Sequence, residues 1–329
     1  MLFKLFSKAR SLGASDIHLT GGKIPMMRLA GKLQKLDEAV IHAQALEQFL
    51  RQLLPEHLQQ ILKQCGEVDA AFCDAAGERY RLNVYQQKDA YALAIRLLAS
   101  KIPACEEIGL PQSVQNLLTL TQGLVLVTGA TGSGKSTTLA ALVERFNQSQ
   151  ALHILTLEDP IEYVYPQGLA LINQREIGRD TKSFASGLRS ALRQDPDVIL
   201  VGELRDAETI AIALTAAETG HLVLATLHTQ DVMSSISRIL DALPKSQQQV
   251  RTQLAECLQA VVCQKLLVRA DGAGRVAAFE VLIATDALRN LIREGKTHQL
   301  ASYVQTGARY GMVTMADYIA SLKKQGIVI

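Results

Sequence analysis

The architecture of this chain can be worked out from one segment, which reads Gly129, Ala130, Thr131, Gly132, Ser133, Gly134, Lys135 and Ser136. The segment follows the apolar run 124–127 and leads into 137–146, whose apolar spacing predicts a helix. Glycines let successive backbone N–H groups curve around an anion, and the N-terminal end of the next helix adds a positive partial charge. A strand, a glycine-rich loop and a helix in this order predict a site for nucleotide phosphates.

The last residues of this loop have separate expected roles. Lys135 is expected to reach the β- and γ-phosphates, and the hydroxyl of Ser136 to ligate Mg²⁺, which prefers oxygen ligands. Thr137 follows them in the first turn of the predicted helix and is expected to lie at the nucleotide as well. The expected ligands are therefore a nucleoside triphosphate and Mg²⁺.

The composition is that of a globular protein with a large core. The chain has 329 residues, of which 48% are hydrophobic and 20% charged, and this length predicts about two domains. The formal net charge is only +2, and there is no stripe of Lys and Arg with interleaved aromatic residues, so nothing favours nucleic-acid binding. The five cysteines are widely spaced and form no C-x-x-C pair, which favours reduced thiols in a cytoplasm.

No segment predicts insertion into a membrane. The apolar part of residues 1–10 is too short for the core of a signal peptide. The longest apolar run, 210–217, is far below the roughly 20 residues that a membrane helix needs. We therefore expect any membrane association to be peripheral or to depend on a partner.

Residues 1–100 predict a small α+β domain. They contain one helical region, 44–64, together with short alternating runs at 16–20, 26–30, 68–72, 79–85 and 91–97. Residues 101–111 lose this periodicity and contain Pro103, Gly109 and Pro111, so we expect the interdomain linker there.

Residues 112–329 predict an α/β domain with a helical C-terminal part from about residue 245. Near-continuous apolar runs at 124–127, 153–157, 198–201 and 222–225 are typical of parallel strands that are covered on both faces. Helical patterns lie between them at 137–146, 183–193 and 207–219. The expected fold is a doubly wound nucleotide-binding core.

Polar residues follow the ends of these predicted strands, where such a sheet carries its chemistry. They are Glu158, Asp159 and Glu162 after the second strand, Glu203 after the third and His228 after the fourth. Glu203 has the position of an acid that holds Mg²⁺, and Glu162 that of a carboxylate that orients the attacking water. Spacing alone leaves these two roles interchangeable.

The same segments resemble the motifs of the type II and type IV secretion ATPase superfamily. The resemblance covers the phosphate loop, an aspartate box at 155–163, a Walker B segment at 200–206, a histidine box at 219–229 and the motif A-S-D-I-H-L at 14–19. It implies a RecA-like P-loop core with a small PAS-like N-terminal domain, and ATP as the nucleotide. It further implies that Glu158, Asp159 and His221 contact the nucleotide and that His228 acts in catalysis.

Two C-terminal segments are similar to PilT-like pilus retraction ATPases. Residues 287–294 read A-L-R-N-L-I-R-E, and residues 305–315 continue the match. Taken by itself, the first segment predicts a plain surface helix with Asp286 as N-cap and Gly295 as its end. The chain also lacks the four-cysteine metal motif common in the pilus-extension and secretion members.

This resemblance implies a homohexamer in which sites are completed between subunits. Arg81 and Arg96 fall where the family has nucleotide-contacting arginines, and surface or strand-pairing roles are the alternative for both. The implied activity is Mg²⁺-dependent ATP hydrolysis at the cytoplasmic base of a type IV pilus, which produces twitching motility or DNA uptake. The implied partners are an inner-membrane platform protein and possibly a sister ATPase.

Other functions use the same site. An assembly or type II secretion ATPase would keep every motif of the nucleotide site. An accessory ring would bind ATP with little turnover, and a ring that translocates DNA would need salt-sensitive DNA binding.

Overall fold

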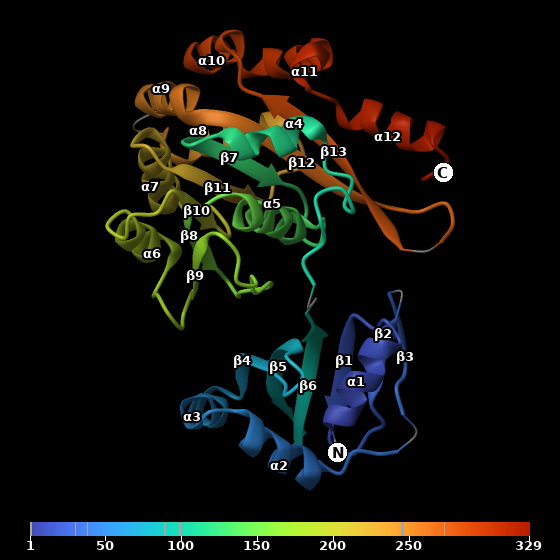
Figure 1. Cartoon of the computed structure of the whole chain (residues 1–329). Helices are drawn as coiled ribbons and strands as arrows, with labels where there is room; N and C mark the ends of the chain where they lie inside the picture. Colours follow the sequence, from blue (N-terminus) through green and yellow to red (C-terminus); the bar gives the residue numbers. More distant parts are fainter. Residues whose placement is uncertain are drawn as a thin grey trace. The chain divides into compact units, whose positions relative to one another are not determined.

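The computed structural model describes residues 2–29, 31–37, 39–88, 90–98, 101–244, 247–272 and 274–329. The chain divides into two compact units, Met1–Lys101 and Ile102–Ile329 (Figure 1). Among the described residues, no helix combines the length and the apolar character needed to cross a bilayer.

The first unit is an antiparallel sheet with helices on one face. Its strand order is β3-β2-β1-β6-β5-β4, and the strands are β1 Asp16–Thr20, β2 Met26–Leu29, β3 Lys32–Lys35, β4 Glu67–Cys73, β5 Arg79–Gln87 and β6 Ala90–Leu97. Side chains from these strands bury a core with α1 Phe3–Ser11, α2 Ala43–Leu53 and α3 Glu56–Cys65. Every second residue of β1 and β5 points into this core.

The predicted helical region 44–64 consists of two helices. Pro55 is the N-cap of α3, and Leu54 before it is extended. A proline cannot donate the backbone hydrogen bond of a helix interior, and it disfavours a helical conformation of the residue before it. The sequence interpretation missed this break.

The second unit is built on a seven-stranded sheet in the order β13-β12-β7-β11-β10-β8-β9. All neighbouring strands are parallel except β12 and β13. The strands are β7 Gly123–Thr128, β8 His153–Glu158, β9 Leu171–Glu176, β10 Val198–Val201, β11 Leu222–Leu227, β12 Leu258–Val268 and β13 Arg275–Ile283. The predicted parallel α/β core is confirmed, with its four apolar runs as β7, β8, β10 and β11.

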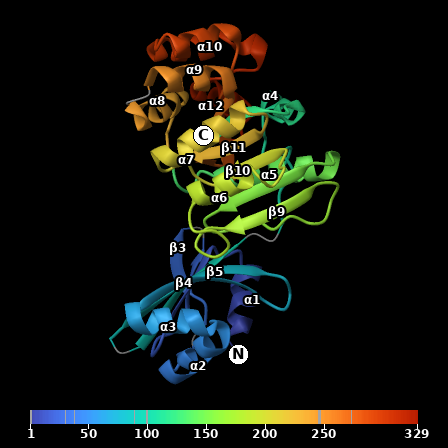
Figure 2. The same cartoon turned by 90° about the vertical axis from the view of Figure 1, so that its left-hand side faces the viewer.

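Helices cover both faces of this sheet (Figures 1 and 2). Leu124 and Leu126 of β7 point to one face, whereas Val125 and Val127 point to the other. The first core includes side chains of α6 Phe184–Ala191, α7 Ala207–Glu218, α8 Val232–Ala242, α9 Gln247–Cys257, α10 Asp286–Arg293 and α11 Leu300–Thr306. The second includes those of α4 Gln112–Gln115 and α5 Lys135–Ser149, while α12 Met315–Lys324 packs on β13.

The C-terminal part differs from the sequence expectation. Residues 258–283 are mostly strand and not helix, because β12 pairs with β7 and carries β13 on its other side. A short apolar run can be a buried strand or a buried helix, and its periodicity does not separate the two. Residues 258–268 form a strand because they pair with the side of β7 that β11 leaves open. This pairing is a tertiary contact, which the local sequence pattern does not contain.

The region expected to be a linker contributes to the second unit. Cys105 and Leu110 are buried in its core, and the Cys105 thiol donates to the backbone oxygen of Ala141 at 3.5 Å. Pro111 precedes the short helix α4. The loss of periodicity at 101–111 therefore indicated irregular backbone correctly. This segment is packed against the core of the second unit and is not a free linker.

Candidate nucleotide-binding and catalytic site

The glycine-rich loop connects the carboxyl end of β7 to the first turn of α5. Gly129, Gly132 and Gly134 all have positive φ angles, of 144°, 77° and 90°. A Cβ at Gly129 would collide with the carbonyl oxygen of Gln264 on β12, and one at Gly134 would lie 2.8 Å from the Gln264 side-chain nitrogen. The loop therefore needs glycine at these positions both for its backbone angles and for its packing.

Lys135 closes the loop on itself. Its ammonium donates to the backbone oxygens of Gly129 at 2.8 Å and of Ala130 at 3.1 Å, and the residue is only 8% exposed. Burial lowers the pKa of Lys135, and the nearby Glu203 carboxylate opposes this shift. The hydroxyl of Ser133 is buried in the same loop and has no hydrogen-bond partner in the described part of the chain.

A chain of polar side chains leads from this loop to the end of β10. The hydroxyl of Thr131 lies 3.3 Å from His228 Nδ1, and His228 Nε2 lies 3.3 Å from Glu203 Oε1. The other carboxylate oxygen, Oε2, accepts a hydrogen bond from Arg205 Nε at 2.6 Å. Arg205 Nη1 in turn lies 3.6 Å from the Asp159 carboxylate. Residues after four different strands therefore meet, because the carboxyl ends of parallel strands share one edge of the sheet.

The backbone around His228 is anchored to the phosphate loop. Thr229 and Ser235 share a hydrogen bond of 2.7 Å between their hydroxyls, and Ser235 reaches Thr128 at the end of β7 at 3.3 Å. The thiol of Cys263 on β12 donates to the backbone oxygen of Gln230 at 3.0 Å. These bonds tie the loop after β11 to the end of β7 and to β12.

The two glutamates of the aspartate box face different surroundings. Glu158 accepts hydrogen bonds from Thr156 Oγ1 at 2.7 Å and from Gln174 at 3.0 Å, so its carboxylate is used within β8 and β9. Glu162 is partly exposed and has no hydrogen-bond or ion-pair partner within the described residues. The neighbouring Tyr163 hydroxyl lies 3.0 Å from Thr137 Oγ1, which ties this loop to α5.

His221 is not part of the cluster. It precedes β11, and its backbone oxygen accepts from the N–H of Gly123 at the start of β7, whereas the phosphate loop follows the end of β7. Its Nδ1 lies 3.1 Å from the backbone oxygen of Ala216 in α7. The prediction that His221 contacts the nucleotide therefore conflicts with its position at the opposite edge of the sheet.

Arg81 and Arg96 lie in the first unit, directly opposite each other on β5 and β6. Arg96 Nε is 3.2 Å from the carboxylate of Asp16, and the Arg96 side chain is 65% exposed. Both side chains project from the sheet face opposite the helical core, because their neighbours Leu82 and Ile95 point into that core.

Three other arginines find partners within the chain. Arg189 pairs with Glu208 of α7, and Arg193 donates to the backbone oxygen of Arg189. Arg289 of α10 donates to the backbone oxygens of Ala255 and Glu256 at 2.6 and 2.7 Å. This bond holds the end of α9, so α10 is more than a plain surface helix, and its N-cap is Thr285 and not Asp286.

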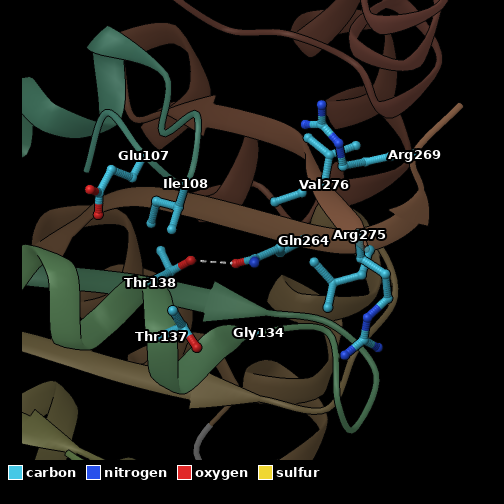
Figure 3. Close-up of a pocket in the computed structure, with 11 residues that line it drawn as sticks. Glu107, Ile108, Gly134, Thr137, Thr138, Gln264, Arg269, Arg275 and Val276 are labelled. Atoms are coloured by element: carbon cyan, nitrogen blue, oxygen red, sulfur yellow. Dashed lines mark hydrogen bonds between the residues drawn. The ribbon is translucent and has the colours of Figure 1, made fainter. Parts of the chain in front are cut away.

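A cavity of about 390 Å³ opens beside the phosphate loop. Gly134, Thr137 and Thr138 line one side, and residues of β12, β13 and the segment before α4 line the other. Figure 3 shows the hydroxyl of Thr138 pointing at Gln264, to which it donates at 2.7 Å. The sequence interpretation missed this wall, although Gln264 within the apolar run 258–268 was a signal, because buried strands rarely carry an unneeded polar side chain.

Comparisons with known proteins agree with this geometry. The family model described as "Type II/IV secretion system protein" matches residues 92–273. The uncharacterized protein YggR of Escherichia coli K12 is 51% identical over 301 residues, which are 91% of each chain. The type IV pilus retraction ATPase PilT of Pseudomonas aeruginosa is 42% identical over 99% of this chain and 94% of its own.

A solved structure extends this agreement to three dimensions. The crystal structure of the pilus retraction motor PilT with bound ADP superposes with a TM-score of 0.93 at 44% identity, over 100% of this chain and 94% of that one. The phosphate loop and the residues after β8, β10 and β11 thus belong to a fold that is shared over the whole chain. The chain is a member of the type II/IV secretion system protein family.

Proposed function

We propose that this chain is a subunit of an ATP-hydrolysing motor that drives retraction of a type IV pilus or a closely similar filament. The observation that carries the proposal is the joint position of Lys135, Glu203 and His228 along one edge of the sheet. The similarity to a pilus retraction ATPase over nearly the whole length of both chains supports the motor function.

The loop is suited to the phosphates of ATP. Lys135 is now bonded to two carbonyl oxygens of the loop, and phosphate oxygens would take the place of these neutral acceptors. The orphaned hydroxyl of Ser133 is a further donor with no competing partner among the described residues. The cavity beside Thr137 and Thr138 is of a size that suits the nucleoside part.

Ser136 and Glu203 are the residues that would hold Mg²⁺. Ser136 is exposed in the first turn of α5. The Glu203 carboxylate, which can supply an oxygen ligand, lies just after β10, and its side chain is 19% exposed. Magnesium in such sites is usually bound by one or two side chains and by the phosphates, and it neutralises charge that develops on the phosphate oxygens.

We assign the orientation of the attacking water to Glu162. Glu203 already has two cationic or polar partners, whereas the Glu162 carboxylate is uncommitted and lies next to Tyr163, which is bonded to α5. A carboxylate that accepts a hydrogen bond from water contributes typically 10²- to 10⁴-fold in rate. His228, which touches both Glu203 and Thr131, is placed to respond to a γ-phosphate in the loop.

The motor would be a homohexamer that works in the cytoplasm against an inner-membrane platform protein, possibly together with a sister ATPase. Arg81 and Arg96 would contribute positive charge to a nucleotide held by a neighbouring subunit. An arginine that acts on the transferred phosphate in this way can raise the rate by about 10³-fold or more.

The test is MgATP turnover per subunit over a wide range of protein concentration, with Glu162→Gln as control. We expect specific activity that rises cooperatively with concentration and is lost in the control, which should still bind ATP. Turnover in Glu162→Gln equal to that of the natural chain would refute the assignment. ATP binding without turnover at any concentration would favour the accessory ring.

The direction of the motor needs an experiment in the host. Loss of a retraction motor leaves excess surface filaments, whereas loss of an assembly or secretion motor removes filaments or exported protein. Counting surface filaments after deletion of the gene therefore separates these two activities.

A further inference from the structure

The Glu203 carboxylate, which would bind Mg²⁺, already accepts a hydrogen bond from a positively charged side chain. Arg205 Nε donates to Glu203 Oε2 at 2.6 Å, at the short end of charge-assisted hydrogen bonds. A guanidinium is always charged in proteins, so this bond joins a permanent cation to the carboxylate. Arg205 and a metal ion would therefore compete for the same negative charge.

The backbone on both sides of Arg205 is fixed, whereas its side chain is more exposed than buried. Leu204 is buried, and its N–H donates to the backbone oxygen of Thr226 at 3.0 Å. The Asp206 carboxylate caps α7 by accepting from Thr209 N at 2.8 Å. The side chain of Arg205 between them is 58% exposed. Its guanidinium can therefore leave Glu203 without any change in the course of the chain.

Both partners keep a second contact when this bond breaks. Arg205 Nη1 is already 3.6 Å from Asp159 on the aspartate-box loop. Glu203 Oε1 is 3.3 Å from His228, which Thr131 orients through its other ring nitrogen. The move from Glu203 to Asp159 thus exchanges one carboxylate for another within reach of a flexible side chain.

Resting on the proposed function, we propose that Arg205 is a positioning residue that serves as the internal counter-ion of Glu203. It holds the carboxylate in place in the empty site and turns to Asp159 when the nucleotide loads with Mg²⁺. Arg205 thereby sets the Mg²⁺ concentration at which the site fills. Asp159 and Glu162 lie on the same loop after β8, so a new bond between Arg205 and Asp159 would also shift the Glu162 carboxylate when the nucleotide binds.

The guanidinium and the backbone oxygen of Arg205 both have partners within its own chain. Both acceptors of its guanidinium, Glu203 and Asp159, belong to the same chain. Its backbone oxygen also accepts from Arg238 of α8 at 3.4 Å.

The experiment is a Mg²⁺ titration of nucleotide binding, monitored with a fluorescent ADP analogue and no hydrolysis. In Arg205→Gln, the Mg²⁺ concentration for half-maximal binding should fall by up to about fivefold, the value of a partly exposed ion pair. Affinity for the analogue in EDTA should be unchanged. Arg51→Gln, which removes an exposed pair with Glu47 in the first unit, is the matched control and should leave the titration unchanged.

A second background tests the route through Glu203. In Glu203→Gln, the added change Arg205→Gln should no longer alter the half-maximal Mg²⁺ concentration. The carboxylate for which Arg205 and Mg²⁺ compete is then absent. Arg205→Lys should give an intermediate value, since an ammonium is a point charge without the two-sided fork of arginine.

Several results would overturn the inference while leaving the proposed function intact. An unchanged or increased Mg²⁺ requirement in Arg205→Gln would do so, as would an effect of equal size in the Glu203→Gln background. Absence of nucleotide binding by the natural chain would instead refute the proposed function itself.

Discussion

The two edges of the large sheet carry similar residue types but differ in how these residues are bonded. At the amino end, His153 and His221 lie within hydrogen-bond distance of the backbone oxygens of Asp195 and Ala216, and Asp197 accepts from the backbone N–H of His153. His153 Nε2 has one neutral side-chain partner, Asn173, at 2.8 Å. At the carboxyl end, Glu203, Arg205 and His228 bond to one another through their side chains.

This difference separates structural from functional polar residues. A side chain bonded to the backbone at a helix or strand end completes the hydrogen bonding of that end, and its contribution is to stability. Lys135 differs, because its backbone acceptors lie in the phosphate loop itself. Side chains bonded to one another at a partly exposed edge keep charges that a ligand can engage. The location of a histidine in a motif is therefore less informative than the atoms that it contacts.

The largest expected effect is at the carboxyl edge. Lys135→Ala should reduce ATP turnover by about 10²-fold or more, because it removes a preorganised positive charge from the phosphate loop. The measurement is steady-state phosphate release. Lys296→Ala, which removes an exposed pair with Glu294, is the control and should change turnover less than about twofold. Comparable losses in both variants would mean that the assay reports folding and not the site.

Two glycines provide the next comparison, Gly123 at the start of β7 and Gly134 at the end of the phosphate loop, where α5 begins. Gly123 has a φ of 112° and Gly134 one of 90°, and a Cβ at either would lie within 2.8 Å of atoms of β12 or its start. Replacement of each by alanine should cost about 1–3 kcal/mol of unfolding free energy, measured by urea denaturation. Only Gly134→Ala should also weaken ADP binding. Equal weakening by Gly123→Ala would contradict a functional difference between the two edges.

Alanine variants of His228 and His221 should differ in the same way, with smaller effects on turnover and stability. His228→Ala should lower kcat about tenfold, because Glu203 and Thr131 lose their shared partner. His221→Ala should keep kcat within about twofold but reduce stability by about 1 kcal/mol through loss of the bond to Ala216. A fall in kcat for His221→Ala without loss of stability would mean that His221 does take part in the nucleotide site.

Glu280 should give the smallest effect. It lies on β13 beside the carboxyl edge, yet it accepts from a backbone N–H, that of Val232 at 3.2 Å. Burial raises the pKa of Glu280 above its ordinary value of 4.5, and Asp231 adds to the shift. A raised pKa in the folded state stabilises the protein below pH 4.5, and this contribution is lost as the pH rises through the folded-state pKa.

The test for Glu280 is the difference in unfolding free energy between Glu280→Gln and the natural chain as a function of pH. The amide keeps an acceptor for Val232 without the buried charge. We expect the variant to be more stable at pH 7 by no more than about 1 kcal/mol after solvent screening, with the difference disappearing near pH 4. A pH-independent difference would mean that charge burial is not its cause.

Much of the second unit followed from local patterns. The apolar runs that became β7, β8, β10 and β11 were long and uniform enough to identify buried parallel strands. Their order along the chain then placed Glu203 and His228 at the same edge as Lys135. Strands β9, β12 and β13 were missed, because a short apolar run can be a buried strand or a buried helix and its periodicity does not separate the two.

The sequence by itself determined the phosphate loop, because a backbone that wraps an anion demands glycine, lysine and a hydroxyl at set positions within a few residues. It also determined the α/β class and the family. Only the tertiary structure decided that His221 is a helix-end residue, that Arg205 is the partner of Glu203, and that Gln264 supports the loop. The bond between Thr138 and Gln264 joins residues far apart in the chain and depends on which strands become neighbours. Glu203 and Arg205 are only two positions apart, but their spacing in the sequence does not say which way either side chain points.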